Sequence, residues 1–244
     1  MAEWLDAAGR FFNPEPRVRV VPLPHGSQCV VVDDALANPE GVRQWAATQA
    51  FGTPSFPYPG LVLGAPKTMG EQMAVLFAQH ARAPLGGRRT LQHEVRMSVL
   101  STPPEALEPL LWQCHRDRVL TDAESQMLVA AGVLYLFDDP ALGGTSFYRP
   151  LQGPVETDRM LADSAVLDAA TFSARHGVQP GYMTDSNAYF ERVARVLPVW
   201  NRAIFYDGSL FHAPDVDHPT RQSADVLRGR LTLNGFFACR RAAA

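Results

Sequence analysis

Hydrophobic and polar residues alternate along much of this chain with the two-residue period of β-strands. The most apolar stretch, residues 127–137, is typical of a buried central strand and is followed by an acidic turn and the pair Gly143-Gly144, after which a hairpin partner is expected at 145–148. The other predicted strands lie at residues 17–23, 28–32, 90–101, 202–206 and 228–238.

Helical spacing is confined to a few segments between these strands. Asn38 followed by Pro39 is a helix-start signal, and the apolar spacing after it predicts a helix to about residue 50. Further helices are predicted at 70–82, across a helical excursion at 156–176, and at 186–196. The stretches 51–67 and 208–227 are expected to be ordered loops. The pattern therefore predicts one domain that is mainly β with peripheral α-helices.

Composition narrows the function without naming it. Of 244 residues, 46% are hydrophobic, and 25 acidic against 22 basic side chains give a formal charge of −3. No polybasic run suggests nucleic-acid binding, and no stretch is apolar enough to span a membrane. The N-terminus lacks a signal-peptide pattern, so a cytoplasmic protein is expected. Cys29, Cys114 and Cys239 are odd in number and widely spaced, which favours buried thiols over disulfides.

The sequence Gln113-Cys-His115-Arg-Asp117 contains the first candidate chemistry. On an extended segment His115 and Asp117 point to the same side, where they offer two adjacent ligands for a divalent ion. The same letters match the HRD of a protein-kinase catalytic loop. A kinase also needs a glycine-rich loop, an asparagine at fixed spacing and a DFG, and none is present.

A distal histidine offers a third ligand. His212 follows a predicted strand and a glycine turn, and together with His115 and Asp117 it would complete the two-histidine, one-carboxylate facial triad of non-haem Fe(II) oxygenases. His218, deeper in the same loop, is the alternative third ligand. Each histidine taken alone is as compatible with a structural role.

The last predicted strand has one polar and one apolar face. Arg228, Arg230, Thr232 and Asn234 share the polar side, opposite Leu231 and Leu233. Inside a barrel, an arginine on that side needs an anionic partner, which the distal carboxylate of 2-oxoglutarate would supply. An edge strand with its polar face in water is the alternative.

In combination and order, these motifs resemble the prolyl-4-hydroxylase-like 2-oxoglutarate/Fe(II)-dependent oxygenase superfamily, and more narrowly a bacterial branch of it that is a domain of unknown function. The resemblance covers about residues 97–239 and is weaker over 30–60. The motifs on which the resemblance rests are the HxD motif, Tyr135-Leu136, the run Gly143-Gly144-Thr-Ser-Phe-Tyr-Arg149, Asn201-Arg202 before His212, and Gly229-Arg-Leu-Thr-Leu-Asn-Gly-Phe-Phe237.

The resemblance implies a double-stranded β-helix (jelly roll, cupin-like) in a single domain, 1–244, with its catalytic core at about 90–240 and the strands and helices of 15–85 packed on it. It implies Fe(II) ligands His115, Asp117 and His212. It assigns Arg230 to the distal carboxylate of 2-oxoglutarate, with Tyr135 and Thr232 assisting. Many relatives place the basic residue about ten positions after the histidine, which keeps Arg221 open beside Arg230, and Arg228 is a further alternative.

The expected activity is that of an Fe(II)/2-oxoglutarate-dependent dioxygenase that uses O₂, releases succinate and CO₂, and hydroxylates a C–H bond. The expected substrate is a peptide, a protein side chain or a small metabolite, with no nucleic-acid or membrane partner. The sequence predicts no oligomeric state. Two alternatives are a non-catalytic jelly-roll module that binds or senses a metal or ligand, and a cupin-type metalloenzyme that does not use 2-oxoglutarate.

Overall fold

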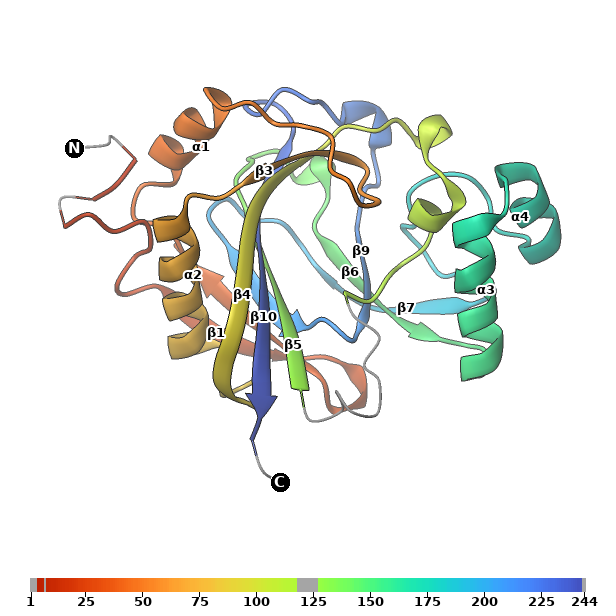
Figure 1. The fold of residues 1–244 in the computed structure, drawn as a ribbon, viewed down its shortest axis with the longest axis horizontal. Coiled ribbons are helices and arrows are strands. Elements are labelled where there is room, and N and C mark those ends of the chain that lie inside the picture. The colour runs from red at the N-terminus through yellow and green to blue at the C-terminus, as the bar shows by residue number, and fades with distance from the viewer. Residues whose placement is uncertain (1–3, 7, 118–126, 243–244) are drawn as a thin grey trace.

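Ten β-strands form two antiparallel sheets in the computed structural model, which describes residues 4–6, 8–117 and 127–242 (Figure 1). The larger sheet has the order β1-β2-β8-β5-β10-β4-β3, and the smaller has the order β7-β6-β9. The larger sheet contains β1 (Arg17–Pro22), β2 (Gln28–Asp33), β3 (Gly60–Gly64), β4 (Gly87–Leu100), β5 (Met127–Tyr135), β8 (Ala203–Asp207) and β10 (Arg230–Arg241). The smaller contains β6 (Thr145–Pro150), β7 (Phe190–Val196) and β9 (Phe211–Pro214).

The chain passes repeatedly from one sheet to the other. After β4 in the larger sheet, His115 pairs with His212 of β9, so the short segment around His115 extends the smaller sheet. The chain then returns to the larger sheet with β5, forms β6 and β7 in the smaller one, and alternates through β8, β9 and β10. Two facing sheets connected in this way form a jelly roll, the double-stranded β-helix predicted from the sequence.

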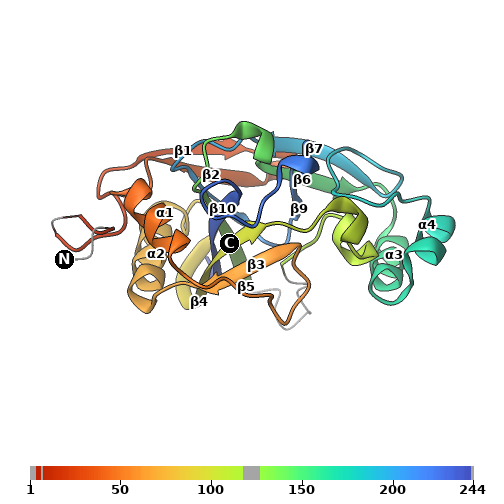
Figure 2. The same ribbon diagram turned by 90° about the horizontal axis from the view of Figure 1, so that it is seen from above.

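Helices cover the outer faces at opposite ends of the molecule (Figure 2). The helices α1 (Pro39–Ala47) and α2 (Lys67–His80) lie by the larger sheet, and α3 (Pro154–Val166) and α4 (Ala169–His176) lie at the other end. Phe77 of α2 stacks on Phe237 of β10 with ring centroids 4.1 Å apart. Leu231 and Leu233 of β10 are buried in the same core, so the opposite face of that strand is directed into the barrel.

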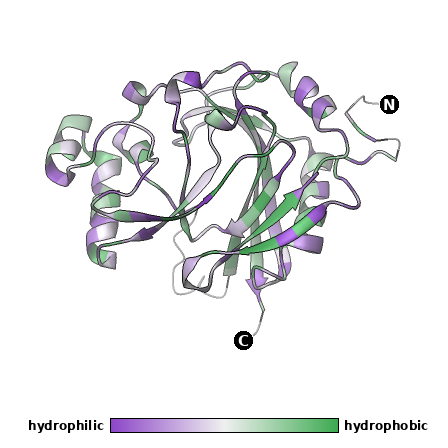
Figure 3. Cartoon of the chain, turned by 180° about the vertical axis from the view of Figure 1, so that it is seen from behind, coloured by the Kyte–Doolittle hydropathy of each residue, from purple (hydrophilic) through white to green (hydrophobic). Residues whose placement is uncertain are grey.

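Hydropathy follows these layers. In Figure 3 the strands of the larger sheet are mainly hydrophobic, whereas the outer helices mix hydrophobic and hydrophilic positions. A second core cluster joins the two sheets through residues such as Tyr135 and Phe147, and a third packs α3 and α4 against the smaller sheet through Met160 and Phe172. No helix among the described residues is both long and apolar enough to cross a membrane.

Most predicted elements are confirmed, including the helix start at Asn38, whose side chain accepts a hydrogen bond from the Gly41 amide at 2.9 Å. The excursion at 156–176 is helical but divided, because Asp168 caps a new helix by accepting from the Thr171 amide. A 3₁₀ turn, η3 (Pro109–Trp112), precedes the segment with His115 and Asp117, and further short turns are η1 (Pro24–Gly26), η2 (Pro104–Ala106), η5 (Pro140–Leu142) and η6 (Pro219–Arg221).

Five predictions of local structure are wrong. Residues 190–196 form β7 rather than part of a helix, because pairing with β6 satisfies their backbone groups. β6 is not the hairpin partner of β5 but lies in the other sheet, between β7 and β9. The expected loops at 51–67 and 208–227 contain the strands β3 and β9, respectively. Arg228 lies in an exposed turn before β10 begins at Arg230, so these two arginines do not share a strand face.

Candidate metal centre

Backbone hydrogen bonds bring the three candidate ligands together from distant parts of the chain. The His115 amide donates to the His212 carbonyl, and the His212 amide donates to the His115 carbonyl, each at 2.9 Å. The Asp117 amide donates to the Gly208 carbonyl at 2.9 Å. The triad is therefore anchored at both ends to β9 and to the turn that precedes it.

The three side chains converge. Nε2 of His115 lies 3.7 Å from Oδ1 of Asp117, and Nε2 of His212 lies 3.6 Å from Oδ2 of Asp117. One candidate ligand atom from each residue lies within 4.8 Å of the others. Oδ2 of Asp117 is buried and has no hydrogen-bond partner among the described residues. A buried carboxylate oxygen without a partner is unfavourable, and a divalent cation would satisfy it.

The protonation states suit a metal ligand set. Nδ1 of His212 lies 2.8 Å from the Leu210 carbonyl, so that nitrogen carries the proton and Nε2 is left to face Asp117. Burial lowers the pKa of His212 to about 4, so its imidazole is neutral at neutral pH. Burial opposes ionisation of Asp117, but the neighbouring His212 and His115 outweigh it and hold the pKa of the carboxyl below its usual value. Two imidazoles and one carboxylate fit Fe(II) or another divalent ion of similar preference.

Arg230 reaches the same cavity from β10. It is 4% exposed, its Nε donates to the Gly143 carbonyl at 2.8 Å, and an Nη donates to the Gly144 carbonyl at 2.7 Å. Its guanidinium also lies 5.8 Å from the ring centroid of Tyr135. No carboxylate of the described residues forms an ion pair with it, so the charge is held by neutral groups alone. Such a site favours an anionic ligand.

The glycine pair that holds Arg230 is structurally constrained, which gives a testable prediction. Gly143 has φ +88°, and a Cβ there would lie 1.9 Å from the Asp215 carbonyl oxygen. We expect Gly143→Ala to lower the free energy of unfolding by about 3 kcal/mol or more, because it combines an unfavourable φ with a backbone clash.

The matched control is Gly177→Ala. Gly177 also has positive φ, +66°, but a Cβ there meets nothing within 4 Å. This variant should lose only about 1–2 kcal/mol, the cost of the conformation alone. Denaturant unfolding measures both, and equal losses would show that the clash at residue 143 is relieved by local movement.

Tyr135 and Thr232 lie behind the cavity surface rather than on it. The Tyr135 hydroxyl is 2.8 Å from Oγ1 of Thr145, and it is Thr145 that lines the cavity. Thr232 exchanges a hydrogen bond with Ser98 at 3.1 Å within the sheet. Direct contact of either residue with 2-oxoglutarate stays a prediction.

The alternatives to Arg230 and His212 lie outside the cavity. Arg221 is half exposed and pairs with Asp139 at 2.7 Å. Arg228 is largely exposed beside Asp225, and His218 is exposed. None of the three belongs to the cavity lining, which includes both Arg230 and His212.

The cavity has a volume of about 450 Å³ and lies between the sheets. Its wall includes polar residues that the sequence did not single out as site residues, among them Arg96 of β4 and Tyr206 of β8. Arg96 and Ser98 share the side of β4 that is opposite the buried Met97 and Val99. The polar face of the predicted strand 90–101 is therefore the sequence signal that could have identified Arg96 as a residue of the cavity wall.

Comparison with known families gives one clear match. Residues 14–237 match the model of a family of unknown function, DUF6445. The chain belongs to this family. The match spans the three candidate metal ligands and Arg230, so all four residues lie within the part of the chain that matches the DUF6445 model. No curated protein matched the chain.

Several solved structures resemble this DUF6445 protein at low identity. HygX from Streptomyces hygroscopicus, solved with nickel and 2-oxoglutarate bound, is 13% identical over 87% of this chain and 82% of its own, with a TM-score of 0.48. The non-heme α-ketoglutarate-dependent epimerase SnoN from nogalamycin biosynthesis is 14% identical over 88% and 81%, with a TM-score of 0.44. EvdO2 from Micromonospora carbonacea var. aurantiaca, complexed with 2-oxoglutarate, is 11% identical over 93% and 96%, with a TM-score of 0.43. Similarity at this level leaves the reaction and substrate of the DUF6445 protein open.

Proposed function

We propose that this protein is an Fe(II)/2-oxoglutarate-dependent dioxygenase that hydroxylates a C–H bond of its substrate. The observation that carries the proposal is the composition of one cavity. The cavity contains the triad of His115, Asp117 and His212, in which a buried carboxylate oxygen of Asp117 has no hydrogen-bond partner among the described residues. It also contains the buried Arg230, which forms no ion pair with a carboxylate of the described residues. A divalent ion and a dicarboxylate would satisfy both groups together.

In this proposal each residue has a defined task. His115, Asp117 and His212 hold Fe(II), and Arg230 binds the distal carboxylate of 2-oxoglutarate. Bound Fe(II) supplies O₂ activation coupled to conversion of 2-oxoglutarate into succinate and CO₂. The Leu210 carbonyl keeps Nε2 of His212 directed at the metal position.

Thr145 lines the cavity where Tyr135 does not, so we propose that the Thr145 hydroxyl makes the hydrogen bond to 2-oxoglutarate predicted for Tyr135. Tyr135 then positions Thr145 through the contact of 2.8 Å between their oxygens. Thr232 has the same indirect role, because its hydrogen bond to Ser98 joins β10 to β4 next to Arg230. Apolar residues of the wall, such as Leu100 and Val133, exclude water from the reacting groups.

The deciding experiment measures succinate. Protein loaded anaerobically with Fe(II) and 2-oxoglutarate and then exposed to O₂ should form succinate, and treatment with EDTA should abolish this activity until Fe(II) is restored. The anaerobic complex should also show a charge-transfer absorption band. Metal binding without the band or succinate would refute the proposal and leave both the cupin-type metalloenzyme and a metal-binding, non-catalytic module. Absence of metal binding would leave the non-catalytic module and refute the proposal.

A further inference from the structure

We propose that the primary substrate is a small organic acid with an apolar body, and that its anionic group binds Arg96. This inference rests on the proposed function, because it assigns the part of the cavity not taken by the metal and 2-oxoglutarate. Arg96 lines the cavity from β4, opposite Asn234 of β10 in the strand register.

Two aromatic rings fix the Arg96 guanidinium in place. It lies 4.3 Å from the ring centroid of Phe56, in the loop before β3, and 4.5 Å from that of Phe236 on β10. Stacking occupies the faces of the planar group and leaves the N–H donors at its edge available. A guanidinium held in this way has lost its rotamer freedom before a ligand binds, which favours affinity for an anion.

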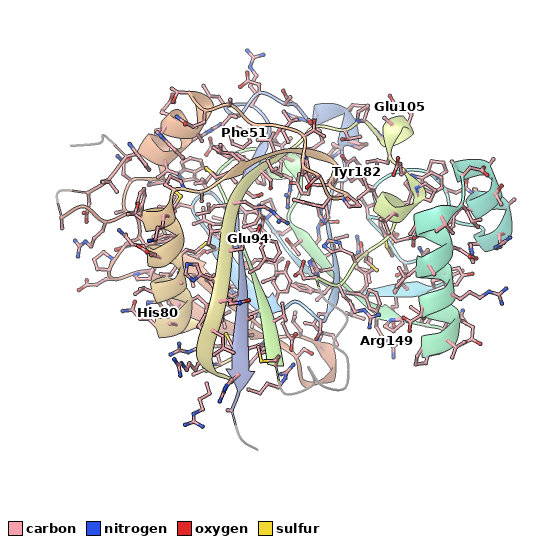
Figure 4. The ribbon with its side chains drawn as sticks, viewed as in Figure 1. Phe51, His80, Glu94, Glu105, Arg149 and Tyr182 are labelled. Carbon is pink, nitrogen blue, oxygen red and sulfur yellow. The ribbon has the colours of Figure 1, made fainter. Side chains whose placement is uncertain are left out.

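The carboxylate beside Arg96 is a weak competitor. Nη1 of Arg96 lies 3.1 Å from Oε1 of Glu94, whose side chain is 68% exposed. Exposed ion pairs contribute little to stability, so a ligand carboxylate can displace or share this contact. In Figure 4 Glu94 lies on β4, and Tyr182, another residue of the cavity lining, lies toward Glu105 of η2.

Gln113 provides an independent indication of the same ligand chemistry. Oδ1 of Asn187 accepts hydrogen bonds from the Tyr189 and Phe190 amides, both at 2.9 Å, which fixes the orientation of the Asn187 side chain. Nδ2 of Asn187 therefore faces Gln113 and donates to its Oε1 at 3.2 Å. Nε2 of Gln113 is left buried in the cavity wall without a partner among the described residues.

Apart from Oδ2 of Asp117 at the candidate metal position, the unsatisfied buried side-chain atom among the described lining residues is a donor, Nε2 of Gln113. Gln113 is 4% exposed, so its free N–H groups need an acceptor from a ligand. The described lining residues include three arginines but one carboxylate, that of Asp117, which belongs to the candidate metal triad. The third arginine, Arg116, pairs with Asp158 at the surface. Once 2-oxoglutarate has neutralised Arg230, the remaining charge favours a second anion.

The rest of the wall determines the body of the ligand. It is formed mainly by apolar and aromatic side chains, which include Leu110, Leu111, Phe236 and Phe56. The volume of about 450 Å³ falls within the usual range of small-molecule sites, roughly 300–1,000 Å³. A compact acid with an aromatic or aliphatic body fits both properties.

The test uses acids beside their neutral isosteres. Phenylacetate, 3-phenylpropionate, indole-3-acetate and hexanoate, each paired with its primary amide, are titrated against the protein by ligand-observed NMR, with and without saturating 2-oxoglutarate. We expect at least one acid to bind more tightly than its amide. Arg96→Gln should weaken that acid by roughly tenfold or more and leave the amide unchanged.

Three variants complete the design. Arg149→Gln removes an exposed arginine that pairs with Glu191 outside the cavity, at the lower right of Figure 4, and should bind like the wild type. Glu94→Gln removes the competitor and should tighten acid binding severalfold. Gln113→Glu keeps an oxygen for Asn187 but replaces the free donor with a negative charge, so acid binding should weaken.

Several results would overturn the proposal. They are an absence of preference for the acids, a preference that persists in Arg96→Gln, or one that is lost only in Arg230→Met. Loss of 2-oxoglutarate affinity rather than acid affinity in Gln113→Glu would reassign that residue to the co-substrate. The same titrations of the acids are also carried out on metal-free protein. Acid binding is therefore measured independently of succinate formation, and a failure to form succinate counts against the proposed function alone.

Discussion

Replacing His212 with alanine is expected to abolish succinate formation from 2-oxoglutarate and to weaken Fe(II) binding by at least ~100-fold. The imidazole is one of three convergent candidate ligands, and the remaining pair, His115 and Asp117, cannot complete the facial set. Because β9 is held by backbone hydrogen bonds rather than by this side chain, the fold should survive. Bound iron and succinate are measured on the same preparation, with thermal unfolding as the check on folding.

The matched control for this variant is His218→Ala. His218 lies six residues further on, is exposed and is absent from the cavity lining, so its removal should leave both measurements unchanged. If His212→Ala retains succinate formation while His218→Ala loses it, the third ligand is His218 and the geometry around Leu210 has another purpose. The pair therefore separates the two histidines that the sequence left open.

The sequence was informative where chemistry is local. His115 and Asp117 are two residues apart, so strand periodicity alone puts both side chains on one side of an extended segment. The contribution of His212 depends on a long-range pairing, since its backbone bonds to His115 across 97 positions. Spacing along the chain cannot supply that contact, which is why His218 remained an alternative until the register of β9 was known.

The wrong assignment of residues 190–196 has a similar cause. Phe190 and Val196 are buried at the ends of β7, and the apolar residues between them fit a helical stripe as well as a partly buried strand. Pairing with β6, distant in sequence, decides the outcome. β9 has only four residues and ends in Pro214, so periodicity is too short to reveal it within a loop rich in proline and aspartate.

The cavity wall was the least predictable part. Alternation along β4 places Arg96 opposite the buried core face, but only the approach of Phe56 and Phe236 shows how its guanidinium is held. Gln113 was part of a recognised motif, yet its free donor follows from the orientation of Asn187, 74 residues away. Tyr135 likewise lies behind Thr145, which separates it from the cavity. Strand periodicity predicts the side to which a side chain points but not its distance from the cavity surface.

Arg230→Met is expected to raise the KM for 2-oxoglutarate by about 100-fold, with a smaller change in kcat. A guanidinium bound to a carboxylate makes charge-assisted hydrogen bonds of about 1.5–3 kcal/mol each, and methionine keeps much of the side-chain volume without any donor. The Gly143 and Gly144 carbonyls also lose their partners, so some stability should be lost as well. A raised KM alone would not separate a binding role from a structural one.

Discrimination between two co-substrates separates a binding role of Arg230 from a structural one. 2-Oxopentanoate has the same chain length as 2-oxoglutarate but lacks the distal carboxylate, so wild-type enzyme should strongly prefer 2-oxoglutarate. In Arg230→Met that preference should fall toward unity, whereas Arg221→Ala and Arg228→Ala, at exposed ion pairs, should retain it. Arg230→Lys should be intermediate, because it keeps the charge but not the planar fork. A variant at position 230 that is unstable yet still discriminates would move the carboxylate site elsewhere in the cavity, and the only other lining arginines of the described residues are Arg96 and Arg116.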